Sequence, residues 1–428
     1  MFGFQKYLTE WAIRKGRAAI FADCGTGKSL MELVWADNVI RHTNRHVLVL
    51  TPLAVGHQMI QEGKKFGIDC VRSSDGSVPD KPAIVVTNYQ RLHYFNPNDF
   101  AGVVGDESSA IKNADSKTKG IVTEFMRTIP YRLLCTATAA PNDYHELGTS
   151  SEALGYLGFR DMITQFFAQE TSKENLGWGR TKYRFRGHAE RPFWRWVCSW
   201  ARAMRKPSDL GFDDNGFILP PLVESETLVK TGFRRDGYLF SLPAVDMHEQ
   251  REERRNTIKE RCEQAAGNAD SHDGPSVAWV HLNSESDALE KMIPDSLQVS
   301  GSMSDDKKED RLLAFTRGDL KVLITKPKIG AWGLNWQHCH NIIMFPSYSW
   351  EQYYQAVRRC YRFGQEKPVN VDIIVTEGEL NVLKSLRRKA KQTDVMFDSL
   401  VAEMNHELNV EKVAYGNDPV CVPEWMKG

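Results

Sequence analysis

Short apolar runs alternate with amphipathic segments through the first part of the chain. Five of these runs have the length and composition of strands, at residues 18–22, 47–51, 83–87, 101–105 and 132–136. Segments with helical spacing of apolar residues follow the first four runs. Buried strands that alternate with helices are typical of a parallel sheet covered on both faces. We therefore predict a first α/β domain over residues 1–150.

The same alternation returns near residue 276. Further strand-like runs stand at residues 277–280, 297–299, 322–325, 341–344 and 369–375, with helical segments between them. Residues 276–400 are therefore predicted to form a second α/β domain, and residues 401–428 a C-terminal extension. The expected fold class is α/β, with two parallel-sheet domains and a helical, basic insertion between them.

The segment between these domains, residues 151–275, differs in composition. Between Trp178 and Lys206, nine cationic residues stand with one acid, and seven aromatic residues are interleaved among them. Cations beside flat rings are typical of nucleic-acid-binding surfaces, whereas the alternative is a helix whose rings pack inward while its arginines stay in solvent. The aromatic residues of 193–203 have helical spacing, so we expect a helix with most rings in the core. The arginines that we expect to face nucleic acid are Arg180, Arg184 and Arg186.

Residues 246–264 form a second distinctive stretch of this middle segment. Glutamate and arginine dominate it, and apolar residues are few. Such a composition is typical of a helix that is exposed to solvent. We predict a charged connecting helix that leads to the second domain.

A glycine-rich turn follows the first apolar run. Residues 22–29 read Ala-Asp-Cys-Gly-Thr-Gly-Lys-Ser, and a helical segment starts directly after them. In that context the backbone N–H groups of Gly25, Thr26 and Gly27 can wrap a diphosphate at the positive end of the helix. Lys28 would reach the β- and γ-phosphates, and the Ser29 hydroxyl would bind Mg²⁺. The alternative is a glycine-rich turn with an incidental lysine, because alanine occupies the first glycine position of the strict motif.

An acidic pair, Asp106 and Glu107, stands directly after the apolar run at residues 100–105. In α/β sheets the carboxyl ends of the strands are where ligands bind. Asp106 can hold Mg²⁺ through water, and Glu107 can orient and deprotonate an attacking water. One carboxylate pair is usually a solvated loop, but a pair at a strand end downstream of a phosphate loop indicates an ATPase. The expected cofactors are ATP and Mg²⁺.

The overall composition restricts how such a protein could bind a polyanion. Lys and Arg together number 55, as do Asp and Glu, so only a local basic patch could hold nucleic acid. The eight cysteines include no Cys-x-x-Cys pair, which is typical of reduced thiols in a cytoplasmic protein. No apolar run approaches the length of a membrane span, and the first twenty residues lack a signal-peptide pattern. We expect a soluble protein of the cytoplasm with no membrane association.

Further motifs follow the acidic pair in a regular order along the chain. They are Ile111-Lys112-Asn113, Thr136-Ala137-Thr138, Leu219-Pro220-Pro221, Gly333-Leu334-Asn335 and a run from Gln355 to Gln365. That last run contains three arginines and ends in Phe-Gly-Gln. Together with the phosphate loop, these motifs resemble a superfamily 2 helicase or translocase. The similarity is to the Swi/Snf-like branch, especially its compact bacteriophage-encoded versions, and covers about residues 3–375.

The resemblance implies two RecA-like domains and a role for each motif. Gln5 would read adenine, Gly333 and Gln355 would contact the nucleotide, and Arg359 and Arg362 would be arginine fingers against the γ-phosphate. DNA would cross both domains on the opposite side, held through phosphates and without sequence specificity. The implied DNA contacts in the two motor domains are Thr51, Thr87, Asn88, Lys112 and Lys328.

This chain departs from the family pattern at two places. Ser108-Ser109 follow the acidic pair where Gly-His is commoner, and Arg358 stands where chromatin remodellers usually have aspartate. The family also suggests a setting, namely a bacterial or phage-infected cytoplasm with replication or recombination proteins as partners. We therefore predict an ATP-dependent DNA translocase or helicase.

Three alternatives remain open on sequence grounds. An RNA helicase would use the same ATPase chemistry but would bind RNA instead of DNA. A DNA-binding scaffold with a vestigial motor would retain the fold without turnover, although Lys28, Glu107 and both arginine fingers are intact. A nuclease subunit would need a partner for cleavage, because no separate carboxylate and lysine cluster stands outside the motor motifs.

Overall fold

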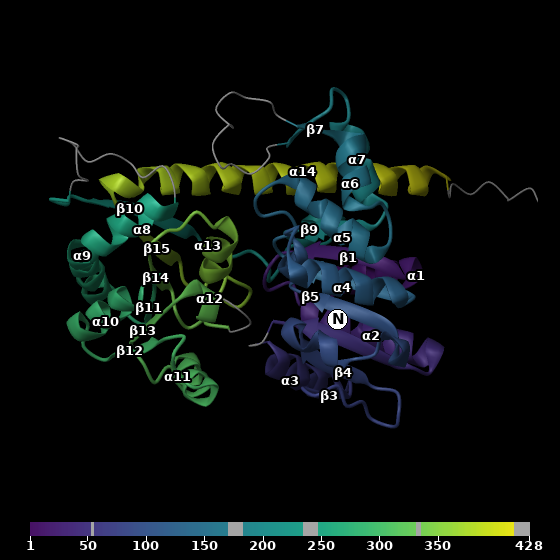
Figure 1. The fold of residues 1–428 in the computed structure, drawn as a ribbon, viewed down its shortest axis with the longest axis horizontal. Coiled ribbons are helices and arrows are strands. Elements are labelled where there is room, and N and C mark those ends of the chain that lie inside the picture. Colours follow the sequence, from purple (N-terminus) through teal and green to yellow (C-terminus); the bar gives the residue numbers. More distant parts are fainter. Residues whose placement is uncertain (53–54, 170–182, 234–246, 331–334, 415–428) are drawn as a thin grey trace, which may run out of the picture.

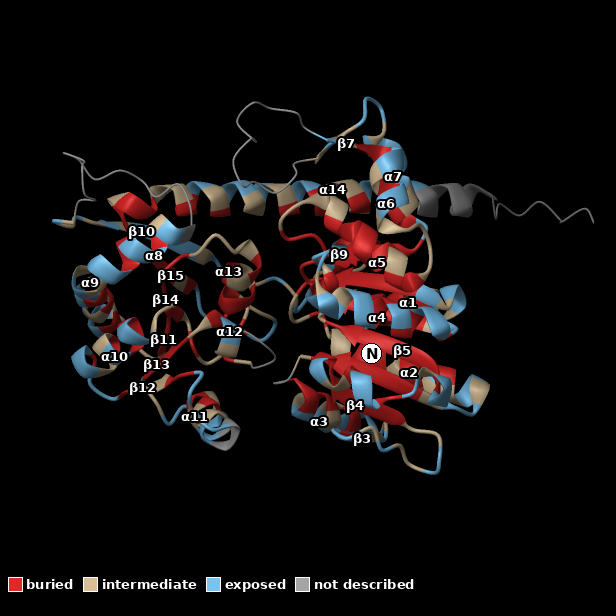
Figure 2. Cartoon of the chain, in the orientation of Figure 1, coloured by how far each residue is buried: buried red, intermediate tan, exposed pale blue. Residues whose placement is uncertain are grey.

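Two α/β domains lie side by side in the computed structural model, and one long helix runs along both of them (Figure 1). The structure describes residues 1–52, 55–169, 183–233, 247–330 and 335–414. Buried residues concentrate in the strands and on the inner helix faces of each domain (Figure 2). Each domain therefore has a core of its own.

The first domain is built on a seven-stranded sheet with the order β3-β4-β2-β5-β6-β1-β9, in which every pairing is parallel. Its strands are β1 (Arg17–Ala22), β2 (His46–Thr51), β3 (Cys70–Arg72), β4 (Ile84–Asn88), β5 (Phe100–Asp106), β6 (Tyr131–Thr136) and β9 (Ala201–Met204). Its helices include α1 (Gly3–Lys15), α2 (Lys28–Thr43), α3 (Gly56–Phe66), α4 (Lys117–Thr128) and α5 (Leu147–Leu154). All seven residues of β5 are buried, as expected for a central strand covered on both faces.

The second domain contains a six-stranded sheet with the order β10-β15-β14-β11-β13-β12, which is also parallel throughout. Its strands are β10 (Leu222–Val229), β11 (Ser276–Trp279), β12 (Ser296–Val299), β13 (Val322–Thr325), β14 (Asn341–Met344) and β15 (Val369–Thr376). Its helices include α10 (Asn283–Met292), α11 (Asp305–Arg317), α12 (Pro327–Gly330) and α13 (Trp350–Val357). The two predicted parallel sheets are thus confirmed.

The middle segment contributes to both domains instead of standing apart. It contains α6 (Phe159–Phe166), β7 (Phe167–Gln169), β8 (Tyr183–Phe185) and α7 (Glu190–Cys198). The helix expected over residues 193–203 ends at Cys198, because the next apolar residues form β9 and pair with β1. Phe193, Trp194 and Trp200 are buried in the first core, which confirms the expected role of these rings.

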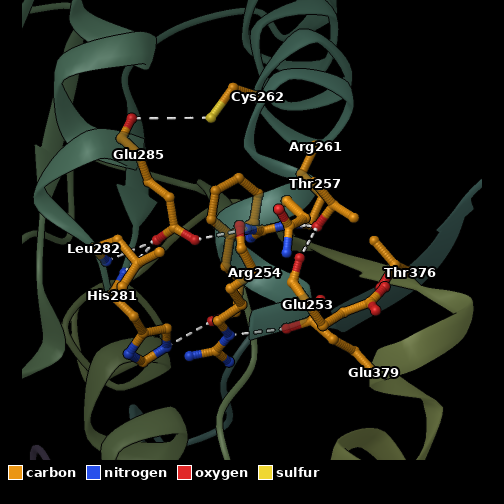
Figure 3. A network of polar contacts seen from close by, with 12 residues as sticks. Glu253, Arg254, Thr257, Arg261, Cys262, His281, Leu282, Glu285, Thr376 and Glu379 are labelled. Carbon is orange, nitrogen blue, oxygen red and sulfur yellow. Dashed lines mark hydrogen bonds and ion pairs between the residues drawn. The ribbon is translucent and has the colours of Figure 1, made fainter. Parts of the chain in front are cut away.

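Helices α8 (Met247–Asn256) and α9 (Ile258–Ser271) correct the prediction of a solvated connector at residues 246–264. Three of their charged side chains, Glu253, Arg254 and Arg261, are buried inside the second domain, whereas others such as Arg251 and Lys259 are exposed. Arg261 Nη2 is 2.8 Å from Glu285 Oε1, and both of these side chains are fully buried (Figure 3). Arg254 Nε similarly lies 2.8 Å from Glu379 Oε1. Burial of these charges is tolerated because each has an oppositely charged, hydrogen-bonded partner distant in sequence.

Acidification is expected to destabilise the second domain through His281, at the edge of this polar network. Burial, followed by the charge of Arg254, lowers the pKa of His281 to about 3 from 6.5. The unfolded chain therefore binds the proton more readily, and stability is lost as the pH falls below 6.5. At pH 5 the loss relative to pH 7 should reach about 2 kcal/mol in urea unfolding.

The control for this prediction is His281→Gln, which retains a donor for the Phe345 carbonyl oxygen, 2.8 Å from His281 Nε2. This variant should lose less stability than the wild type between pH 7 and pH 5, whereas replacement of the exposed His188 should change nothing. Equal acid sensitivity of the wild type and His281→Gln would show that the loss of stability does not come from His281.

Helix α14 (Leu380–Ala414) joins the two cores. Leu383 and Leu386 belong to the core of the second domain, whereas Phe397 and Leu400 belong to that of the first. The expected C-terminal extension, from residue 401, begins as a continuation of this helix. Because one continuous helix packs into both cores, it constrains how far the domains can separate (Figure 1). No helix in the described part of the chain is long and apolar enough to cross a membrane.

Candidate nucleotide site and nucleic-acid interface

The predicted phosphate loop connects β1 to α2, in the order of strand, turn and helix that its sequence predicts. Gly25 and Gly27 both have φ near 83°, a left-handed conformation that glycine adopts readily. Lys28 Nζ donates to the carbonyl oxygens of Ala22 and Asp23 at 3.0 and 3.2 Å, so its ammonium group lies over the loop. The loop therefore has the geometry to receive phosphates, with the N-terminus of α2 behind it.

Gln5 packs directly against this loop. Its Nε2 donates to the Thr26 carbonyl oxygen at 2.8 Å, and its Oε1 accepts from the Phe2 backbone N–H at 2.9 Å. A Cβ atom at Gly27 would lie only 2.3 Å from Gln5 Nε2, so a larger residue there would displace the Gln5 amide from the loop. Gln5 thus connects α1 to the turn that would hold the phosphates.

The acidic pair ends β5 beside the loop. Glu107 has φ of 49°, which is uncommon for a residue other than glycine, and its Oε2 accepts from Thr136 Oγ1 at 3.2 Å. Burial, followed by the neighbouring Glu107 carboxylate, raises the pKa of Asp106 to about 7. A cation bound beside Asp106 would favour its ionised form.

Ser29 and Asp106 supply oxygen ligands of the kind that Mg²⁺ prefers. Both residues line the same cavity. Among the described residues, no cluster of three or more His, Cys, Asp or Glu could hold a metal without other ligands. The residues therefore fit a magnesium ion that shares its coordination with nucleotide phosphates and water, as is usual for this metal.

A cavity of about 480 Å³ lies between the two domains. The first domain lines it with phosphate-loop and acidic-pair residues, and the second domain with two arginines and neighbouring residues. The predicted site residues that the structure brings together here are Gln5, Gly25, Gly27, Lys28, Ser29, Asp106, Glu107, Arg359 and Arg362. One concave site thus combines cations, carboxylates and backbone donors from both domains.

The two candidate arginine fingers follow α13. Arg359 is 5% exposed, and Arg362 donates to Asn335 Oδ1. Burial, followed by the nearby Arg359 charge, lowers the pKa of Arg362 to about 10, and its Nε has no hydrogen-bond partner among the residues that the structure describes. One buried and one half-buried guanidinium group that face the same cavity favour an anionic ligand.

Two of the predicted nucleotide-site residues that the structure describes do not line this cavity. Thr26 is buried, and its hydroxyl donates to the Asp23 carbonyl oxygen at 2.7 Å. Gln355 is 1% exposed, and its amide atoms have no partner within the described part of the chain. Gly333 lies outside the described residues. The predicted nucleotide contacts of these residues stay predictions.

The structure also adds aromatic residues that the sequence did not single out. Phe217 and Phe363 stack with ring centroids 4.8 Å apart, and Phe2 meets Phe217 edge-on at 5.1 Å. All three rings line the cavity. In the sequence, Phe2 stands three residues before Gln5, and Phe363 begins the Phe-Gly-Gln ending of the last motif. These two positions were the available signals. Phe217 gave no such signal, because its neighbours in space come from distant parts of the sequence.

A second hollow lies at the carboxyl ends of β2 and β4. It brings together Thr51, Thr87 and Asn88, three of the predicted nucleic-acid contacts. The Thr87 hydroxyl is buried and has no hydrogen-bond partner among described residues. The hollow is also lined by Arg72 and Arg91, which the sequence analysis missed because both stand outside recognisable motifs. Hydroxyl, amide and guanidinium donors together suit a phosphate backbone.

The other predicted nucleic-acid contacts are dispersed. Lys112 forms an ion pair with Glu351 of α13, across the two domains. Lys328 is exposed on α12, and Arg184 and Arg186 are exposed on and directly after β8. Arg180 lies outside the described residues. The structure therefore brings three of the seven described candidates into one hollow and leaves the other four apart.

Comparisons with known proteins agree with this architecture. Residues 272–364 match the family model described as the helicase conserved C-terminal domain. The fold resembles that of Dbp5 from S. cerevisiae bound to RNA and ADP BeF3, with a TM-score of 0.56, 12% identity and coverage of 92% of this chain and 93% of that one. The matched stretch lies within the second domain, and the likeness to Dbp5 is one of fold.

Curated relatives match only a limited stretch. The DNA repair protein rad8 of Schizosaccharomyces pombe is 36% identical over 107 residues, which are 24% of this chain and 9% of that protein. The putative ATP-dependent helicase/translocase YwqA of Bacillus subtilis is 31% identical over 108 residues, 24% of this chain and 12% of that protein. The matched stretches thus span about a tenth of the length of these relatives.

Proposed function

We propose that this protein hydrolyses Mg·ATP in the cavity between its domains and uses the energy to move along DNA. The observation that carries the proposal is the convergence of Lys28, Glu107, Arg359 and Arg362 on one cavity from two separate sheets. A site divided between two domains is complete only when they approach each other. ATP turnover can therefore switch the two domains between closed and open arrangements, as stepping along a strand requires.

Each residue has a distinct role in the proposed reaction. Lys28 binds the β- and γ-phosphates, and Ser29 and Asp106 would hold Mg²⁺, which neutralises charge on the phosphates when bound. Glu107 orients the attacking water and accepts its proton. Arg359 and Arg362 stabilise charge on the transferred phosphoryl group. Gln5 and the rings of Phe2, Phe217 and Phe363, which line the same cavity, would contact the base.

A chain of polar contacts supports coupling between the two domains. Glu107 accepts from Thr136 at 3.2 Å, and the Thr138 backbone N–H donates to Thr136 Oγ1 at 3.0 Å. Thr138 Oγ1 lies 3.5 Å from Glu351 Oε1 of α13, which in turn pairs with Lys112. The proposed water-activating carboxylate is thereby connected to a predicted DNA contact and to the second domain.

DNA is the proposed track, and RNA is the second candidate. The Ile-Lys-Asn and Phe-Gly-Gln segments of the Swi/Snf-like, phage-type resemblance favour DNA. The names of the curated relatives, a DNA repair protein and a putative helicase/translocase, point the same way. Dbp5, whose fold is shared, is bound to RNA, which keeps RNA as the alternative. We further propose a cytoplasmic setting with replication or recombination proteins as partners.

The proposal is tested by measuring ATP hydrolysis with duplex DNA, single-stranded DNA or RNA added in turn. We expect duplex or single-stranded DNA to raise the rate well above that with RNA. Lys28→Ala, which removes the phosphate-binding charge, should show no hydrolysis with any of them. Stimulation by RNA alone would favour the alternative that the protein is an RNA helicase. Lack of hydrolysis by the wild type under all conditions would favour a scaffold.

The hollow beside β2 and β4 provides a separate prediction. Reversing Arg72 and Arg91 to glutamate should weaken DNA binding and flatten its salt dependence, because each lost phosphate contact removes about 0.9 from the log–log slope on duplex DNA. The same change at the exposed Arg184 and Arg186 measures the contribution of the segment around β8. Dissociation constants measured by fluorescence anisotropy across a series of salt concentrations would give the slopes.

Basal ATP hydrolysis should be nearly unchanged in both double variants, since none of these arginines lines the nucleotide cavity. Arg14→Glu, on the exposed face of α1, is the matched control and should keep the wild-type slope. If the Arg72/Arg91 variant also kept the wild-type slope, the hollow would not be a phosphate-binding surface.

A further inference from the structure

An acidic side chain stands within the phosphate loop itself. Asp23 is 4% exposed, and its carboxylate accepts from the Cys24 backbone N–H at 2.6 Å. Its carbonyl oxygen accepts from Lys28 Nζ and from Thr26 Oγ1. A negative charge in this position opposes the binding of polyphosphate, because it lies on the same loop whose N–H groups and lysine attract the anion.

The second domain supplies the partner of this charge. Arg358 Nη2 forms an ion pair with Asp23 Oδ2, and the Tyr354 hydroxyl donates to Asp23 Oδ1. Both charged side chains are largely buried, at 14% and 6% exposed. The contact joins the end of β1 to the end of α13, so separation of the domains would break it.

Arg358 is held firmly in place for this contact. Its guanidinium lies over the rings of Tyr354 and Tyr361, 5.2 and 5.1 Å from their centroids, and Nη1 donates to the Tyr361 carbonyl oxygen at 3.2 Å. Neither Arg358 nor Asp23 lines the nucleotide cavity, in contrast to the adjacent Arg359. Arg358 is therefore a positioning residue, with a role separate from that of the two arginine fingers.

The domains approach closely at this point. A Cβ atom at Gly25 would lie 3.0 Å from the backbone nitrogen of Phe363, so second-domain backbone packs directly on the loop. Closure therefore brings Arg358 to Asp23 at the same time as it brings the fingers to the cavity. Opening would leave the Asp23 carboxylate without its cationic partner, on the same loop that would hold the phosphates.

We propose that the Arg358–Asp23 pair makes nucleotide release depend on domain opening. In the closed arrangement Arg358 cancels the Asp23 charge, and the loop retains the nucleotide. In the open arrangement the uncancelled carboxylate repels the phosphates, and ADP leaves more readily. This inference rests on the proposed ATPase function and adds to it a specific step, the release of product.

The test compares ADP release from the wild type, Arg358→Gln, Asp23→Asn and the double variant. Rates would be measured by stopped flow with a fluorescent ADP analogue, and ADP affinities by calorimetry. We expect Arg358→Gln to release ADP about 5- to 150-fold faster than the wild type, the range typical of coupling between sites. Asp23→Asn should release ADP more slowly than the wild type, and the double variant should lie between the two single variants.

This order of ADP release rates separates an electrostatic role of the Arg358–Asp23 pair from a merely structural one. Loss of a structural contact would accelerate release in both single variants, and that result would overturn the proposal. Arg358→Lys, which keeps the charge, should restore most of the slow release. Arg317→Gln, which breaks an exposed ion pair with Asp319 in the same domain, is the matched control and should behave as the wild type.

The outcomes also distinguish this inference from the proposed function. If the wild type hydrolyses ATP but Arg358→Gln releases ADP at the wild-type rate, the pair has no role in release and the ATPase assignment stands. If the wild type binds no ADP, both fail. Should Arg358→Gln not fold, slower release from Asp23→Asn supports the proposal, and unchanged or faster release from it contradicts the proposal.

Discussion

Glu107→Gln is expected to leave ATP binding intact and to lower the rate of hydrolysis about 10²- to 10⁴-fold, the usual contribution of a general base. Glutamine keeps the size of the side chain and can still accept from Thr136 Oγ1 through its amide oxygen. It cannot take the proton of the attacking water, however. Phosphate release in single-turnover experiments, with nucleotide affinity measured in parallel, would separate binding from chemistry.

The matched control for this prediction is Glu124→Gln, on the exposed face of α4 in the same domain. It should hydrolyse ATP at the wild-type rate. Wild-type turnover by Glu107→Gln would show that another group activates the water. A parallel loss of ATP affinity would instead show that Glu107 acts mainly in binding or in holding the loop.

Arg362→Ala and Arg359→Ala should each lower nucleic-acid-stimulated turnover about 10³- to 10⁵-fold, as is typical for arginine fingers. Both side chains are held in the cavity wall by the second domain, and Arg362 Nε has no partner in the described part of the chain. Their main contact would form with the phosphoryl group in the transition state of its transfer. The expected signature is a lower kcat with little change in nucleotide affinity.

Steady-state kinetics combined with direct binding of a non-hydrolysable ATP analogue would provide this comparison. Arg317→Ala, an exposed position of the second domain, serves as the control. If affinity and turnover fell by the same factor in either finger variant, that arginine would be a ground-state binding residue. Loss of thermal stability in the same variant would indicate a structural role.

The sequence predicted the parts of this fold that depend on local pattern. Apolar runs bounded by turns located ten of the thirteen strands of the two sheets, all but β3, β9 and β10, because a strand buried on both faces must be apolar along its whole length. The phosphate loop and the acidic pair were found because their spacing relative to a strand end is itself the signal. Residues of both motifs lie at the carboxyl ends of the strands, as predicted, and line one cavity.

What the sequence could not predict depends on contacts between distant segments. Residues 246–264 read as a solvated helix, since nothing local shows that Arg254 and Arg261 meet Glu379 and Glu285. Strand β9 was hidden within a stretch of aromatic, helix-like spacing, and only its pairing with β1 defines it. Arg72 and Arg91 likewise join the predicted threonines only through the fold.

Helix α14 places a physical limit on the proposed motor. Its first turns belong to one core and its later turns to the other, and Arg191 and Arg195 of α7 pair with its Glu403 at 2.8 and 3.2 Å. Domain opening must therefore proceed by pivoting about this helix or by bending it. A small, repeated opening fits short steps along a strand better than a wide separation of the domains.

Displacement of a third strand from a DNA triplex is the most direct test of the central claim, movement along DNA driven by ATP. The account predicts that the wild type displaces the strand with ATP and Mg²⁺ but not with a non-hydrolysable ATP analogue. Glu107→Gln should displace the strand at a greatly reduced rate. Vigorous DNA-stimulated ATP hydrolysis without any strand displacement would contradict the account, because hydrolysis would then not be coupled to movement.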